Sequence, residues 1–79
     1  MKTPRDLSWQ DVVRSLSKLG YIVVRQTGSH VRLSTMHNGE HHVTVPAHDP
    51  IRVGTLNAII SDCAAHFGKT KSEIMQELF

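Results

Sequence analysis

The sequence predicts an α+β fold in which a helix, three antiparallel strands and a second helix follow one another, with a short extra helix at the C-terminus. Three observations support this prediction. Apolar residues recur at helical spacing near both ends, a central segment alternates between apolar and polar residues, and turn signals interrupt that segment twice. The predicted sheet has one apolar face, so we expect the helices to pack on that face.

The first helix is expected over residues 8–19, because apolar residues there recur at steps of three and four. These residues are Trp9, Val12, Val13, Leu16 and Leu19. Ser8 is placed to cap the N-terminus, and Asp11 favours the positive end of the helix dipole. Gly20 stands where a left-handed C-cap belongs, so the helix is expected to end there.

Two strands are expected directly after this helix. The segment YIVVRQ is β-branched and aromatic and ends at Thr27 and Gly28, which signal a turn. The next segment, SHVRLSTM, alternates between apolar and polar residues. Val31 and Leu33 are expected on one face, and the polar residues that alternate with them, from His30 onward, on the other.

The third strand is expected in HHVTV, after a second turn signal. Asn38 and Gly39 precede this strand, and an Asn-Gly pair favours a tight hairpin because both residues tolerate positive φ. Pro46 is expected to end the strand, since proline has no backbone N–H to donate. Residues 47–54 then form a loop.

Two further helices are expected after the loop. The apolar spacing of the second is given by Leu56, Ile59, Ile60, Cys63, Ala64 and Phe67. Thr55 is the expected N-cap, and Gly68 lies just beyond the expected end. Thr70 and Glu73 have the spacing of a capping box, which predicts a short last helix reaching residue 79.

Composition places the chain among small globular domains. Its 79 residues are enough for one domain, and nine Lys and Arg against seven Asp and Glu give a net charge of +2. This mild charge permits a polyanionic partner. The single Cys63 cannot form an internal disulfide and lies in an apolar stripe, so we expect a core residue and a reducing cytoplasm. No segment is apolar enough for a signal peptide or a membrane span.

Several short motifs occur in a fixed order along the chain. They are GY at 20–21, RQTGSH at 25–30, VTVPAH at 43–48, GTL at 54–56 and Ile59. In this order and spacing they resemble the HicA-type toxin family over about residues 8–68. The element order is also that of double-stranded-RNA-binding domains. The resemblance implies a toxin, formed by residues 1–79, that cleaves messenger RNA and is neutralised by a HicB-type antitoxin. It also implies that His30 is catalytic and that His48 matches a second family histidine.

The chemistry of the residues is compatible with this activity. Without a metal, RNA is cut when the 2′-hydroxyl attacks the adjacent phosphate, which requires proton transfer and stabilisation of negative charge. Histidine suits the proton transfer near neutral pH. His30 follows Gly28 and Ser29, whose backbone N–H groups and hydroxyl are placed to meet a phosphate. Arg25 and Arg32 flank His30 across the hairpin and are candidate phosphate ligands.

Each of these residues also has an ordinary structural interpretation. A histidine after a Gly-Ser turn is commonly a solvated strand residue, and Arg25 and Arg32 could be plain exposed charges. For His48 we favour a structural or substrate-positioning role over that of a second proton carrier. A non-catalytic module that binds RNA or an antitoxin is therefore the alternative to a ribonuclease.

The six histidines of the chain, among them His37, His41 and His42, are potential metal ligands. Adjacent strand residues point to opposite faces, and neither a second cysteine nor a carboxylate motif accompanies them. We therefore expect no metal and no other cofactor. Trp9 and Tyr21 are able to stack on bases, but Trp9 lies on the apolar stripe of the first helix and is expected to be packed.

Overall fold

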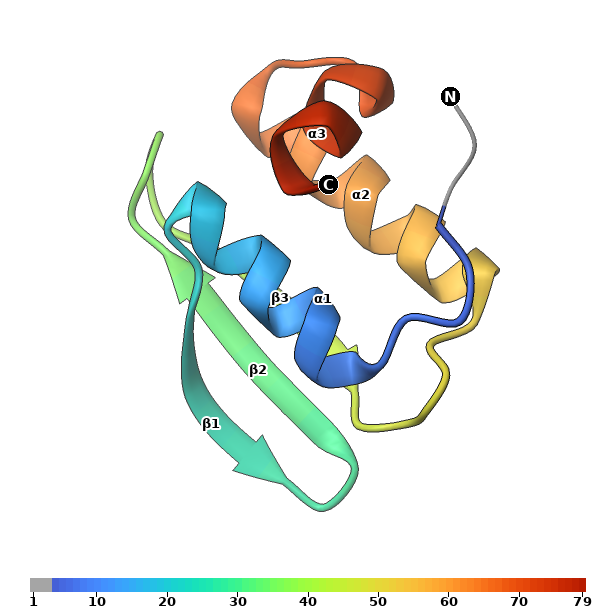
Figure 1. Cartoon of the computed structure of the whole chain (residues 1–79). Helices are drawn as coiled ribbons and strands as arrows, with labels where there is room; N and C mark the ends of the chain where they lie inside the picture. The colour runs from blue at the N-terminus through green and yellow to red at the C-terminus, as the bar shows by residue number, and fades with distance from the viewer. Residues whose placement is uncertain (1–3) are drawn as a thin grey trace.

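Residues 4–79 are described by a computed structural model, in which three helices accompany a three-stranded sheet (Figure 1). The elements in chain order are α1 (Trp9–Leu16), a 3₁₀ turn (Ser17–Leu19), β1 (Ile22–Thr27), β2 (His30–Thr35), β3 (His41–Pro46), α2 (Val53–Phe67) and α3 (Lys71–Leu78). The predicted order of helix, three strands and two helices is therefore confirmed.

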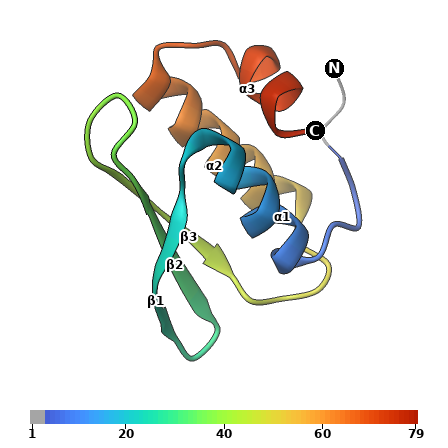
Figure 2. The ribbon, with the colours of Figure 1, turned by 60° about the vertical axis from the view of Figure 1, so that its left-hand side comes forward.

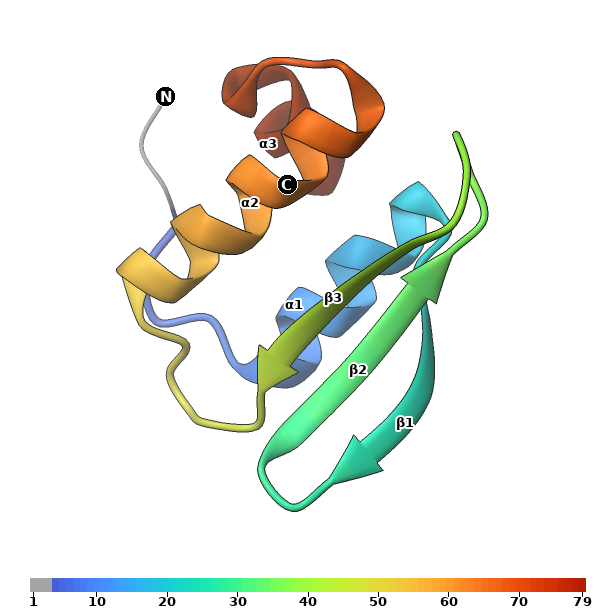
Figure 3. The ribbon, with the colours of Figure 1, turned by 180° about the vertical axis from the view of Figure 1, so that it is seen from behind.

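The sheet is antiparallel, with β2 between β1 and β3. All three helices lie on one side of it, and the other side is open (Figures 2 and 3). On β2 the burial alternates, with Val31 and Leu33 buried and His30 and Arg32 exposed. The predicted division into an apolar and a polar face is thus confirmed, and the polar face is the open one.

The hydrophobic core fills the space between the helices and the strands β2 and β3. Its most buried side chains are Val12, Leu16, Val31, Leu33, Val45, Leu56, Ile60, Cys63, Ile74 and Leu78. Cys63 has no exposed surface, and Trp9 is half-buried against the core, as predicted for both. Burying one such side chain stabilises a fold by about 1.5–3 kcal/mol, so this shared layer holds the sheet to the helices.

Most of the predicted helix ends are confirmed, but α1 ends at Leu16, before the predicted residue 19, because residues 17–19 form the 3₁₀ turn. Ser8 and Thr70 each form a capping box with an acidic residue three positions later. Gly20 adopts the left-handed conformation expected of a C-cap. Thr55, however, is not the N-cap of α2, because the helix begins at Val53 with Arg52 as the N-cap residue. The preceding residue, Ile51, is buried and its N–H bonds to a carbonyl near α1, so tertiary packing sets the start of α2.

The Asn-Gly signal marks a hairpin, as predicted, although the loop is longer than two residues. Asn38 and Gly39 both have positive φ, at 59° and 94°. The last paired residues of β2 and β3 are Thr35 and His41, which leaves five residues in the loop. The other hairpin is tight, because Thr27 pairs with His30 and only Gly28 and Ser29 lie between them.

Strand β1 differs from the other two in being exposed along its whole length. A register irregularity lies between Val23 and Arg25, which is where a β-bulge adds one residue to a strand. None of the residues of β1 belongs to the buried core, although Tyr21, directly before the strand, is buried. The helices therefore bury side chains of β2 and β3, whereas the residues of β1 remain exposed even though α1 approaches this strand.

Candidate functional site

The predicted site residues of the first hairpin meet on the open face of the sheet. Arg25 is paired with Arg32, and Thr27 is paired with His30, so these four side chains form two neighbouring cross-strand pairs. Together with Thr44 of β3 they line a shallow hollow of about 380 Å³. The structure thus places His30 and both arginines in one exposed depression.

Two threonines in this hollow were not singled out from the sequence. Thr27 lies opposite His30, and Thr44 lies opposite Arg32 on the other side of β2. The signal that reveals them is the strand register, since paired residues of an antiparallel sheet share a face. Their hydroxyl groups add donors and acceptors beside the histidine and the arginines.

The arginine pair concentrates positive charge in the hollow. Arg25 and Arg32 are both exposed, and within residues 4–79 no carboxylate forms an ion pair with either of them. Like charges directly opposite on neighbouring strands are unfavourable, by roughly 0.2–1 kcal/mol. An anion in the hollow would relieve this repulsion and could receive several N–H bonds from the two guanidinium groups.

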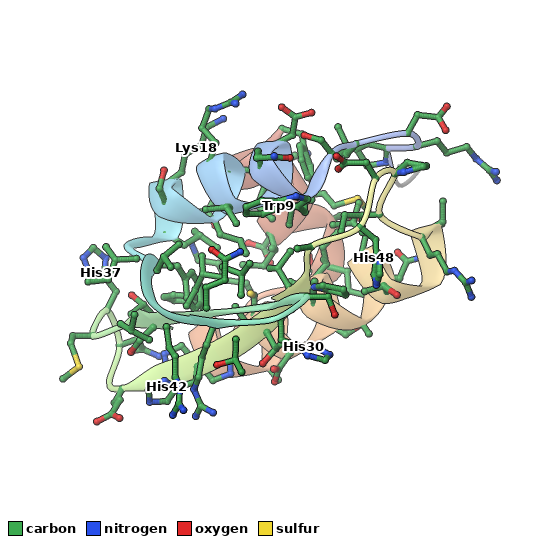
Figure 4. The ribbon with its side chains drawn as sticks, turned by 90° about the horizontal axis from the view of Figure 1, so that it is seen from below. Trp9, Lys18, His30, His37, His42 and His48 are labelled. Carbon is green, nitrogen blue, oxygen red and sulfur yellow. The ribbon has the colours of Figure 1, made fainter. Side chains whose placement is uncertain are left out.

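His30 is the first residue of β2 and emerges from the tight Gly28-Ser29 turn. Gly28 has φ +56°, and an added Cβ would meet nothing within 4 Å, so this turn is open to an approaching ligand. The carbonyl of Ser29 accepts a hydrogen bond from the N–H of Ala47 at 2.6 Å, which ties the turn to the end of β3. In Figure 4 His30 projects on the opposite side of the sheet from Trp9.

His48 does not line the same hollow as His30. It lies in the loop after β3, in a neighbouring depression of about 460 Å³ that also includes Pro46 and Arg52. The two depressions are adjacent because Pro46 is paired with His30. His48 is therefore placed beside the candidate site rather than inside it.

The two histidines of β3, His41 and His42, point to opposite faces of the sheet, as predicted. His42 lies opposite Ser34 and its Nε2 is 2.6 Å from a carboxylate oxygen of Glu40. His41 faces the helices, where its ring stacks on that of His66 with the ring centroids 4.4 Å apart. Among residues 4–79 no three His, Cys, Asp or Glu side chains are arranged so that they could hold a metal ion.

Tyr21 and Cys63 belong to the interior rather than to a site. The hydroxyl of Tyr21 is 2.7 Å from Nδ1 of His41, and the tyrosine is almost fully buried, so it is not available to stack on a base. Burial raises the pKa of the Cys63 thiol and also that of the Tyr21 hydroxyl. Both groups therefore stay protonated near neutral pH, and the thiol is not a nucleophile there.

Comparison with protein families connects this geometry to a known class. Residues 9–64 match the family described as "HicA toxin of bacterial toxin-antitoxin", and this stretch includes every side chain that lines the two depressions. The chain belongs to the HicA toxin family. The predicted family resemblance is thereby confirmed, and a partner antitoxin follows from the family's place in toxin–antitoxin systems.

Comparison of this HicA toxin with curated proteins and with solved structures gave no further relatives. No curated protein and no solved structure matched it. Within residues 4–79, none of the helices has the length and apolar character that crossing a membrane requires.

Proposed function

We propose that this HicA toxin is a metal-independent endoribonuclease that cleaves messenger RNA and uses His30 for acid–base chemistry. The observation that supports it best is the convergence of one exposed histidine and two unpaired arginines in a single hollow. We take residues 1–79 as one toxin domain that acts in the cytoplasm and is neutralised by a HicB-type antitoxin. No cofactor is part of the proposal.

The proposed reaction divides the work among the residues of the hollow. An imidazole nitrogen of His30 accepts the proton of the RNA 2′-hydroxyl, whose oxygen forms a bond to the adjacent phosphorus. The bond from phosphorus to the 5′-oxygen breaks, that oxygen takes up a proton from solvent, and His30 releases its own proton to solvent. Arg25 and Arg32 stabilise the negative charge that builds on the phosphate oxygens. The products are a 2′,3′-cyclic phosphate and a 5′-hydroxyl.

The remaining predicted site residues position the substrate. Gly28 and Ser29 form the exposed turn beside His30, where backbone N–H groups and a hydroxyl can meet the phosphate. His48 lies in the adjacent depression, and we propose that it holds the RNA where the strand leaves the hollow. This placement favours substrate positioning over proton transfer for His48.

A modified RNA tests the proposal because the nucleophile belongs to the substrate. We expect an RNA with one 2′-deoxy residue at the cleavage position to bind nearly as well as normal RNA but to resist cutting there. The extent of cleavage at the deoxy position is compared with cleavage at an unmodified second position in the same strand, which serves as an internal control. EDTA is expected to leave cleavage of the unmodified RNA unchanged.

The other outcomes select different mechanisms. Cutting at the deoxy position would indicate an activated water, and sensitivity to EDTA would indicate a metal ion. Binding without cutting of any RNA would favour the non-catalytic module that binds RNA or an antitoxin.

A further inference from the structure

Strand β1 exposes three apolar side chains in a row. Ile22 is 65% exposed, Val23 47% and Val24 51%. They lie on the first strand of the sheet order, so one side of their backbone has no neighbouring strand within residues 4–79. Such side chains are normally buried, and a consecutive exposed run of them marks an interaction surface more often than isolated exposed residues do.

The edge of β1 has little protection against pairing with another strand. Natural edge strands are commonly blocked by charges, prolines, bulges or a covering element. β1 has one charged residue, Arg25, and one irregularity beside Val24, and its residues remain exposed even though α1 approaches the strand. Ile22 and Val23 precede the irregularity and remain available for a strand that adds to the edge.

The same strand continues into the candidate site. After the apolar run, Arg25 and Thr27 of β1 line the hollow that contains His30. A chain lying along the outer edge of β1 would therefore contact apolar side chains first and reach an unpaired guanidinium next. The complementary partner strand has apolar residues at one end and a carboxylate at the other.

We propose that the antitoxin adds a strand to the outer edge of β1. Charge complementarity favours this occupant over a second copy of the toxin. The residues Ile22–Thr27 include no Asp or Glu, so an identical strand would have no carboxylate for Arg25. This docking site follows from β1 and does not rest on the proposed ribonuclease function.

The test measures binding of the purified toxin to the protein that the neighbouring gene encodes, without RNA. The variant is Ile22→Thr combined with Val24→Thr, because threonine keeps the strand propensity and removes an exposed apolar surface. The matched control is Met36→Thr, since Met36 is 71% exposed but lies in the loop between β2 and β3. We expect the double variant to bind about tenfold or more weakly, and the control to bind like the wild type.

Hydrogen exchange on the unmodified complex tests the same contact without a mutation. We expect backbone amides within residues 22–27 to gain protection when the antitoxin binds, because half of an edge strand's N–H groups lack a partner in the free toxin.

Several results would overturn the proposal. These are equal affinity of the double variant and the wild type, new protection confined to the helices, and no binding of the adjacent protein to the wild-type toxin. A toxin dimer that the double variant dissociates would assign the edge to a second copy. Failure of RNA cleavage is a separate result, because neither measurement includes RNA.

Discussion

Arg25 of β1 and Arg32 of β2 lie directly opposite each other across the antiparallel strands, both exposed on the open face of the sheet. The Gly28-Ser29 turn enforces this pairing, since a two-residue hairpin loop leaves no other register beside it. Two cations held together in this way cost stability in the free protein and favour binding of an anion.

We expect Arg25→Ala or Arg32→Ala to weaken RNA binding and to reduce its dependence on salt. Each phosphate contact that is lost lowers the slope of log affinity against log salt by about 0.7 for single-stranded RNA. Titrations at several salt concentrations measure this slope. Lys71→Ala is the control, because Lys71 is exposed on α3, away from the open face.

An unchanged slope in both arginine variants would contradict this assignment. The binding surface would then be sought on Arg14 and Lys18, which lie along the first helix and the turn that follows it.

We expect His30→Ala to abolish toxicity and to slow RNA cleavage by about 100-fold or more, while folding and most RNA affinity persist. The loss of a general acid–base group has this magnitude, and an exposed side chain contributes little to stability. Single-turnover cleavage assays and circular dichroism measure the two effects. His42→Ala is the matched control, because His42 lies on the same face but outside the hollow.

His48→Ala is expected to reduce cleavage less than His30→Ala does, since His48 lies in the adjacent depression. If His48→Ala abolished cleavage and His30→Ala did not, the two roles would be reversed.

We expect Gly20→Ala to lower the free energy of unfolding by about 2 kcal/mol or more. Gly20 has φ +85°, and an added Cβ would lie 2.8 Å from the His37 ring and 2.9 Å from the Thr35 hydroxyl oxygen. A left-handed residue other than glycine costs roughly 1–2 kcal/mol, and the steric overlap adds to that cost. Urea denaturation gives the free energy of unfolding.

Gly68→Ala separates the two contributions to this cost. Gly68 also has positive φ, at 65°, but an added Cβ there would meet nothing within 4 Å. We expect the smaller, conformational cost alone, about 1 kcal/mol. Equal losses for Gly20→Ala and Gly68→Ala would refute the predicted overlap with His37 and Thr35.

We expect Asp11→Ala to destabilise the toxin at neutral pH and the difference to disappear in acid. Hydrogen bonding with Ser8, whose backbone N–H donates to the Asp11 carboxylate, followed by the charge of Arg14, lowers the pKa of the Asp11 carboxyl below its ordinary value of 3.8. A lowered folded pKa contributes stability that is present above 3.8 and is lost as the pH falls through the folded value. Thermal unfolding of both proteins across this range measures the difference.

Gln10→Ala is the control for this prediction, because Gln10 is exposed on the same helix and does not titrate. Any stability difference that it causes should not vary with pH. A constant difference for Asp11→Ala as well would show that the carboxylate charge is not what stabilises the start of α1.

Local residue patterns were sufficient to predict the elements of this fold. The capping boxes of Ser8 and Thr70 depend on residues only three positions apart, and the turn at Gly28 follows from the conformational freedom of glycine. The meeting of Arg25, Arg32 and His30 was also predictable, because the two-residue turn pairs the two strands residue by residue. These features involve neighbours in the chain, so a single sequence contains the information.

Tertiary packing determined the register within β1, the first residue of α2 and the exposure of β1, which local patterns could not predict. The irregularity beside Val24 shifts the register by one residue, so Val23 lies opposite Leu33 on the helix side rather than on the open face. Ile51, held against the segment before α1, starts α2 before Thr55. Strand β1 is rich in β-branched residues, as buried strands often are, yet its apolar side chains are exposed even though α1 lies close to the strand. Which strand a helix covers depends on contacts between residues far apart in the chain, and no local pattern records them.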